Sequence, residues 1–165
     1  MKKLSILLIS ILCLCGCSAE ETFETINDVW VTPAMADALQ VRMQLPDGAD
    51  ASVLSNGNDE QVYFFDDFSV VVQTLTGGDL ARTIKAVTGF EREKITCIAA
   101  SRDGVDSYSC AWSAAGEGAD QICRAVILDD GVYHYAVTVM ADYTLAASLE
   151  DIWDPLLASV SLSTG

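Results

Sequence analysis

Basic residues and histidine are scarce in this sequence. It has nine lysine and arginine residues against 24 acidic ones, and its one histidine is His134. So large an excess of negative charge repels phosphate backbones, and we therefore expect no nucleic-acid partner. A single histidine, together with the absence of any CxxC spacing, also leaves no usual set of zinc ligands. We expect neither a bound metal nor a cofactor.

Motifs of nucleophilic and phosphate chemistry are missing as well. The chain has no Gly-x-Ser-x-Gly elbow, and Gly77-Gly78-Asp79 lacks the Lys and the Ser or Thr of a P-loop. The segment 56–60 lacks the central Gly and the distal Glu of a calcium loop. We expect these segments and Asp129-Asp130 to be turns, and His134 to be a structural residue on a sheet face. Composition alone leaves a Ser-His-Asp arrangement open, but the sequence predicts no enzyme.

The apolar run at the start of the chain is short. Leu4 to Leu14 is apolar apart from two serines and follows Lys2 and Lys3. As a helix it would rise roughly 16 Å, whereas a bilayer core is about 30 Å thick. A basic start, a short apolar stretch and small residues at its end are typical of a secretory signal peptide. The run is too short for a good permanent anchor.

The tetrapeptide Leu14-Cys15-Gly16-Cys17 ends this run and resembles the bacterial lipobox. Cys15 departs from the commonest pattern, which has Ala or Ser there. The resemblance implies that residues 1–16 are cleaved and that the Cys17 thiol carries a diacylglyceryl group. Two or more acyl chains anchor a protein stably, because each buried CH₂ contributes about 0.8 kcal/mol. The alternative is an ordinary signal peptide whose cysteines are incidental.

The mature chain would be strongly acidic. Seven basic residues and all 24 acidic ones follow Gly16, which leaves a formal charge of −17. Anionic headgroups do not attract such a surface, so the attachment to the membrane has to come from lipid. We therefore expect an exported protein that is lipid-anchored to the outer face of a bacterial membrane.

Residues 17–37 are predicted to be a tether and N-terminal segment, and residues 38–165 a single domain. Thr32-Pro33 favours a helical turn over 33–38. Alternating apolar residues predict a strand over 39–45. Further strands are expected at 61–65, 68–75, 95–102, 106–113, 121–128 and 132–141.

Two helices accompany these strands. Asp79 and Gly89 are a start and a stop signal for a helix over 80–88. A C-terminal helix begins near Ser148 and continues to Val160, and Pro155 should kink it or start a second helix. The expected fold is α+β: an antiparallel β-sheet of about six to seven strands covered by one internal helix and a C-terminal helix. This order of elements resembles the PsbP-like fold, whose members are mostly binding or accessory proteins.

Cys97, Cys110 and Cys123 remain after the signal. If Asp103-Gly104 is a two-residue hairpin loop, Cys97 faces Cys110 in a pair whose Cα atoms are about 4.5 Å apart. That spacing suits a disulfide, and an exported protein can form one. The bridge would add roughly 3 kcal/mol of stability. The alternative is three buried thiols, and in both cases Cys123 is expected to be a buried thiol.

The expected function is that of a non-catalytic accessory or interaction module in the cell envelope, with an unknown partner. The alternative is a lipoprotein that binds a small ligand or cation in a pocket between sheet and helix. A pocket lined by Arg124, His134 or several carboxylates would favour ligand binding. A flat apolar patch around Trp30 would favour a protein partner.

Overall fold

The structure is a computed structural model, and it describes residues 25–26, 28–31, 37–46, 51–55, 60–102, 104–116 and 118–164. The expected signal peptide, Cys17 and most of the expected helical turn over 33–38 lie outside these residues. Among the helices within these ranges, none has the length and apolar character needed to cross a bilayer.

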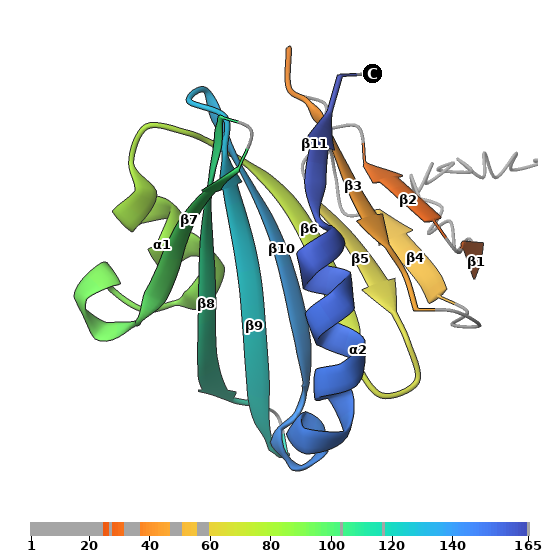
Figure 1. The fold of residues 1–165 in the computed structure, drawn as a ribbon. Helices are drawn as coiled ribbons and strands as arrows, with labels where there is room; N and C mark the ends of the chain where they lie inside the picture. The colour runs from red at the N-terminus through yellow and green to blue at the C-terminus, as the bar shows by residue number, and fades with distance from the viewer. Residues whose placement is uncertain are drawn as a thin grey trace, which may run out of the picture.

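Antiparallel strands make up two sheets (Figure 1). The larger sheet has the order β1-β4-β5-β6-β10-β9-β8-β7, and all its neighbouring strands are antiparallel. Its strands are Thr25–Ile26 (β1), Ala51–Ser55 (β4), Glu60–Phe64 (β5), Ser69–Thr76 (β6), Cys97–Arg102 (β7), Val105–Ala115 (β8), Asp120–Asp129 (β9) and Tyr133–Asp142 (β10). The smaller sheet has the order β11-β3-β2, with β2 at Asp28–Val31, β3 at Gln40–Gln44 and β11 at Ser161–Ser163.

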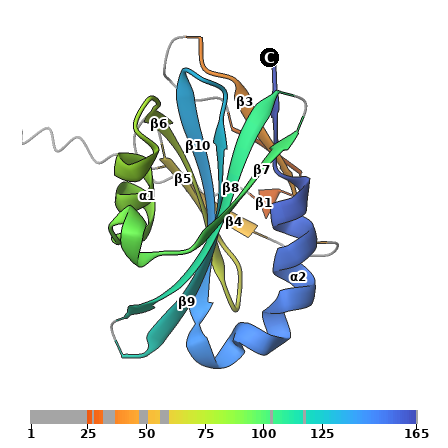
Figure 2. The ribbon, with the colours of Figure 1, turned by 60° about the vertical axis from the view of Figure 1, so that its left-hand side comes forward.

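The two α-helices lie on opposite faces of the larger sheet, as Figure 2 shows. Helix α1 spans Leu80–Thr88, the predicted bounds. The Asp79 carboxylate caps its start by accepting a hydrogen bond from the Arg82 N–H, and Gly89 ends it in the left-handed conformation at φ 78°. Helix α2 spans Ala146–Ser159. Short 3₁₀ turns, Arg92–Lys94 (η1) and Tyr143–Leu145 (η2), complete the elements.

The chain connectivity explains why α1 covers a sheet face. Strand β6 pairs with β10, whereas the next strand in sequence, β7, lies at the far edge of the sheet. The connection from β6 to β7 therefore has to cross one face, and α1 lies in it. At its start, Gly77 donates a hydrogen bond to the Val132 carbonyl. A Cβ at Gly77 would lie 2.5 Å from that oxygen, so a larger residue would push this connection away from β10.

Alternation along β10 divides the core into two faces. On the α2 face, buried residues of β6 and β10 pack with β3 and with α2, including Val41, Val70, Tyr135, Val137, Trp153 and Leu156. On the α1 face, a smaller cluster is formed by Ile84, Ile95, Cys110, Ile127 and Ala136. The two helices thus close two separate cores, and the larger one lies under α2.

The α+β prediction is confirmed, and all seven predicted strands are present. The sheets contain four further strands, β1, β2, β4 and β11, and the predicted strand at 39–45 belongs to the smaller sheet. Each of the four is five residues or shorter and lacks a sustained alternation of apolar and polar residues. Strands β1 and β2 lie within the segment that was predicted to be a tether.

One of the two alternatives predicted for the C-terminal helix is excluded, because Pro155 lies inside the single helix α2 and does not start a second one. The helix also ends at Ser159, because Val160 has an extended backbone and leads into β11, which pairs with β3. The apolar spacing at Val160 and Leu162 suits a helix as well as a short strand, so the pattern alone placed the boundary too late.

Candidate functional site

His134 lies at the centre of a buried polar series on the α1 face. The side chain is 1% exposed. Its Nδ1 lies 2.6 Å from Thr83 Oγ1 on α1, and its Nε2 lies 3.2 Å from Asp129 Oδ2 on the neighbouring strand β9. Helix and sheet are therefore joined through the imidazole, and the predicted position of His134 on a sheet face is confirmed.

The partners of His134 determine where its proton lies in the neutral ring. An ionised carboxylate can only accept, so Nε2 carries the hydrogen and donates it to Asp129. Nδ1 is then an acceptor, and the Thr83 hydroxyl donates to it. Thr83 is 3% exposed, so its hydroxyl is buried between helix and sheet. The series Thr83–His134–Asp129 thus holds α1 against the sheet.

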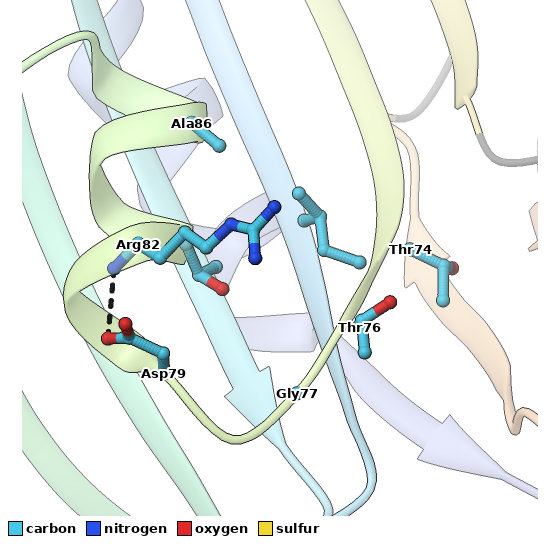
Figure 3. Close-up of a pocket in the computed structure, with 8 residues that line it drawn as sticks. Thr74, Thr76, Gly77, Asp79, Arg82 and Ala86 are labelled. Atoms are coloured by element: carbon cyan, nitrogen blue, oxygen red, sulfur yellow. Dashed lines mark hydrogen bonds between the residues drawn. The ribbon is translucent and has the colours of Figure 1, made fainter.

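A cavity lies beside this series, between α1 and the end of β6 (Figure 3). Its volume is about 440 Å³, within the range of small-molecule pockets, about 300–1,000 Å³. The polar side chains that line it include Asp79, Arg82 and Thr83, and Leu75, Thr76, Gly77 and Ala86 line it too. Thr74 also lies at its edge, but its side chain points away from the helix (Figure 3), because Thr74 pairs with Tyr135 on the α2 face. We call it the α1 cavity.

Two side chains of opposite charge line the α1 cavity. The Arg82 guanidinium extends from α1 toward β6, and the Asp79 carboxylate lies at the start of the helix (Figure 3). Asp79 Oδ1 accepts the backbone N–H of Arg82 at 3.2 Å. Among the described residues, no carboxylate forms an ion pair with the Arg82 guanidinium. Arg82 and Asp79 are both solvent-exposed, so within the described residues the cavity offers an accessible guanidinium without a carboxylate partner.

A second hollow, of about 220 Å³, lies on the opposite side between α2 and the sheet. Arg124 on β9 and Asp154 on α2 line it and form a salt bridge of 2.6 Å with each other. The sequence singled out Arg124 as a ligand-binding candidate. Because its charge is already paired with Asp154 and the hollow is small, Arg124 is the weaker candidate of the two arginines.

A third polar group joins the β9–β10 turn to β3. Tyr135 Oη donates to Asp130 Oδ2 at 2.8 Å and accepts the Leu39 N–H at 2.9 Å. Burial, opposed by the Leu39 hydrogen bond but reinforced by Asp130, raises the pKa of Tyr135 to about 12. Burial also tends to raise the pKa of Asp130, but hydrogen bonds from the Tyr133 and Val132 N–H groups and from Tyr135 outweigh it and lower that pKa. This group stabilises a turn and lines neither cavity.

Of the three cysteines in the domain, two form a disulfide and the third is a free thiol. The register of β7 and β8 places Cys97 opposite Cys110, as the predicted turn requires, and a disulfide joins them with Cα atoms 4.4 Å apart. Cys123 is a free, buried cysteine, and burial raises the pKa of its thiol. A buried thiol of raised pKa is chemically inert, so Cys123 is a packing residue.

The remaining sequence candidates form no site in the part of the chain that the structure describes. Trp30 lies in β2 opposite Arg42, and its side chain is outside the described part. In the segment 56–60, Glu60 alone is described, and it accepts a hydrogen bond from Gln73 at 2.6 Å. No three His, Cys, Asp or Glu side chains gather around a common point within the described ranges.

Sequence reasoning missed Thr83 and Arg82. The capping signal at Asp79 was recognised, but it did not show that the helix it starts would face a cavity. The contact between Thr83 and His134 joins residues 51 positions apart. It depends on the pairing of β6 with β10, which no local pattern encodes.

Several solved structures are similar to this one, including the following two. A protein of Bacteroides thetaiotaomicron VPI-5482 has a TM-score of 0.51 and 11% identity over 75% of this chain, which spans only 45% of the length of that protein. LpqN of Mycobacterium tuberculosis, which is involved in cell envelope biogenesis, has a TM-score of 0.49 and 12% identity, covering 82% of this chain and 90% of LpqN. No protein-family model and no curated protein sequence matches this chain. The likeness to the Bacteroides protein shows a shared fold.

Proposed function

We propose that this chain is an exported bacterial lipoprotein, held at the outer face of a membrane by lipid on Cys17. The observation that carries the proposal is the sequence Leu14-Cys15-Gly16-Cys17, placed directly after a basic start and a short apolar run. The Cys97–Cys110 disulfide supports it, because such bridges persist in oxidising compartments outside the cytoplasm. The domain acts as a non-catalytic accessory or interaction module of the cell envelope.

Intact mass spectrometry of the membrane and medium fractions tests this proposal. We expect a chain that begins at Cys17 and carries a lipid adduct, found with the membranes. Alkylation after denaturation without reductant should modify one thiol, Cys123. Cys17→Ser should yield an uncleaved precursor or release the protein into the medium. Cys15→Ser is the matched control, because Ser is common at that lipobox position, and this variant should be processed normally. A lipid-free mature chain in the medium would contradict the proposal.

A second candidate function is the binding of a small ligand, and the α1 cavity favours it. The cavity has the volume of a ligand site, its guanidinium has no carboxylate partner among the described residues, and the polar series behind it fixes α1 in place. Such a site combines a preformed space with a few convergent polar groups. The ligand-binding function and the lipid anchor are compatible, because they involve different parts of the chain.

A further inference from the structure

The α1 cavity presents two opposite charges that do not neutralise each other. Asp79 and Arg82 both belong to the start of α1 and line the same space. Within the described residues they form no ion pair with each other, and Arg82 forms none with any other carboxylate. A ligand that carries one charge of each sign could therefore contact both.

We propose that the α1 cavity binds a small zwitterion with an ammonium and a carboxylate group, of the size of an amino acid or a dipeptide. The inference rests on the ligand-binding candidate function above. The ligand carboxylate would pair with the Arg82 guanidinium, whose planar fork suits a carboxylate. The ligand ammonium would donate to the Asp79 carboxylate, which has about four acceptor positions and uses one for the Arg82 N–H.

The charge of the whole chain favours a zwitterion over an anion. The formal net charge is −15, so an approaching anion is repelled before it reaches Arg82. A zwitterion has no net charge, so the long-range field does not oppose its approach. A simple cation would gain from that field but would leave Arg82 unpaired, and the many exposed carboxylates would compete for it.

Preorganisation of the first turn of α1 supports the same inference. Thr83 follows Arg82 directly in sequence, and its hydroxyl is bonded to His134, which is bonded in turn to Asp129. Gly77 holds the preceding segment against Val132. The backbone that carries both charges is therefore fixed from two sides. A site whose geometry exists before binding costs less conformational entropy to fill. Thr83 and His134 are positioning residues in this arrangement.

Calorimetric titration of the natively lipidated chain in detergent at pH 6.5 tests the inference. The probes are glycylglycine, N-acetylglycylglycine and glycylglycine amide, which carry both charges, the negative charge alone and the positive charge alone. We expect glycylglycine to bind about two- to fivefold more tightly than either blocked probe, since an ion pair between exposed groups contributes up to about 1 kcal/mol and tenfold corresponds to about 1.4 kcal/mol.

Two substitutions test whether glycylglycine binds in the α1 cavity. Arg82→Gln and Asp79→Asn should each weaken glycylglycine binding about two- to fivefold, for the same reason. Both replacements preserve the helix, because Gln is a good helix former and Asn is a good N-cap. Lys85→Gln is the matched control: Lys85 lies on the same helix, pairs with Glu91 and does not line the cavity, so binding should not change.

The other possible outcomes distinguish failure of the zwitterion inference from failure of the ligand-binding candidate function. If a blocked probe binds as tightly as glycylglycine and Arg82→Gln abolishes its binding, the zwitterion inference fails while ligand binding in the cavity stands. If none of the three probes binds, or if binding is unchanged in both cavity variants, the inference is wrong and the ligand-binding candidate loses its support. The lipoprotein proposal is unaffected in each case, because the mass of the Cys17 peptide decides it.

Discussion

The two faces of the larger sheet are built in different ways. The α2 face is closed by a 14-residue helix and an apolar cluster that includes Trp153, Leu156 and Val137. The α1 face is closed by a nine-residue helix, and four of the five buried polar side chains of the described residues belong to it: Thr83, Thr88, His134 and Thr138. It also carries the disulfide and the α1 cavity.

This difference shows that one face of the sheet provides most of the stability, whereas the other carries most of the buried polar groups. Apolar burial on the α2 face supplies most of the hydrophobic driving force, which scales with the area removed from water. The smaller cluster on the α1 face supplies less. A covalent bridge and a histidine-centred hydrogen-bond series hold that face together instead. The charges of Asp79 and Arg82 can then line a cavity without being buried in the main core.

The largest expected loss of stability comes from the α2 face. Trp153 is 1% exposed and packs edge-on against Phe68, with ring centroids 6.3 Å apart. Trp153→Ala should lower the free energy of unfolding by about 3–5 kcal/mol, because it removes a large buried side chain and leaves a cavity. Urea denaturation measures this, with Tyr143→Ala as the control, since Tyr143 is an aromatic residue that is 56% exposed. Equal losses in the two variants would contradict the assignment of the main core to this face.

The disulfide should have the next largest effect. Replacing both Cys97 and Cys110 by Ser should lower the free energy of unfolding by roughly 3 kcal/mol, because a loop of this size is no longer closed in the unfolded chain. Reductant supplies the control: it should destabilise the native chain to the same degree and leave the double variant unchanged. A native chain that is insensitive to reductant, with Cys97 and Cys110 both open to alkylation, would show that the bridge does not form in the cell.

The features of the α1 face can be predicted from the sequence to different degrees. The bounds of α1 follow from local signals, the Asp79 cap and the Gly89 stop. The pairing of Cys97 with Cys110 follows from counting outward from one tight turn. The position of His134 against Thr83 follows from neither, because it needs the order in which β6 and β10 come together. Local signals therefore fix elements and hairpins, whereas the α1 cavity depends on a long-range strand pairing.

The short strands illustrate the same limit. Strand β11 is the segment Ser-Leu-Ser, and its one large apolar residue predicts no particular structure. It becomes a strand because β3 offers it a hydrogen-bonding edge opposite Arg42, Val41 and Gln40. Tertiary contacts override weak local propensity in such segments. Periodicity therefore predicts only the β3 strand of the smaller sheet, and not the strands that pair with it.

A pH-dependent contribution is expected from Asp130. Its pKa is lowered in the folded chain, because hydrogen bonds from Tyr133, Val132 and Tyr135 outweigh the effect of burial. The stabilisation is therefore complete above the unfolded pKa of about 3.9 and is lost as the pH falls through the lower folded pKa. Asp130→Asn should cost about 1.5 kcal/mol at pH 7, the low end for a hydrogen bond to a charged group, because the side chain is partly exposed.

Denaturation of Asp130→Asn and of the native chain at pH 7 and again near pH 2 measures this contribution. The two chains should differ at pH 7 and converge in the acid. The exposed carboxylate of Asp66 provides the control, since Asp66→Asn should cost little at pH 7. A gap between Asp130→Asn and the native chain that stays constant down to pH 2 would mean that the charge of Asp130 has no part in holding the turn.

The smallest single effect is expected at Thr138, and it sharpens the comparison most, because Thr83 on the same α1 face should respond with the opposite sign. The Thr138 hydroxyl is buried, and among the described residues it has no hydrogen-bond partner. Thr138→Val removes this unpaired group and should raise the free energy of unfolding by about 1 kcal/mol. Thr83→Val should lower it by about 1–3 kcal/mol, because Nδ1 of His134 is left buried and unsatisfied.

The same denaturation curves decide both substitutions, and each is the control for the other. Thr and Val have similar shapes, so the two replacements differ mainly in whether the lost hydroxyl was bonded. If both variants lose stability, the Thr138 hydroxyl has a partner in the folded chain and the α1 face contains a further polar pairing. If neither loses stability, the Thr83–His134 bond contributes nothing to the attachment of α1, and the preorganisation argued for Asp79 and Arg82 fails with it.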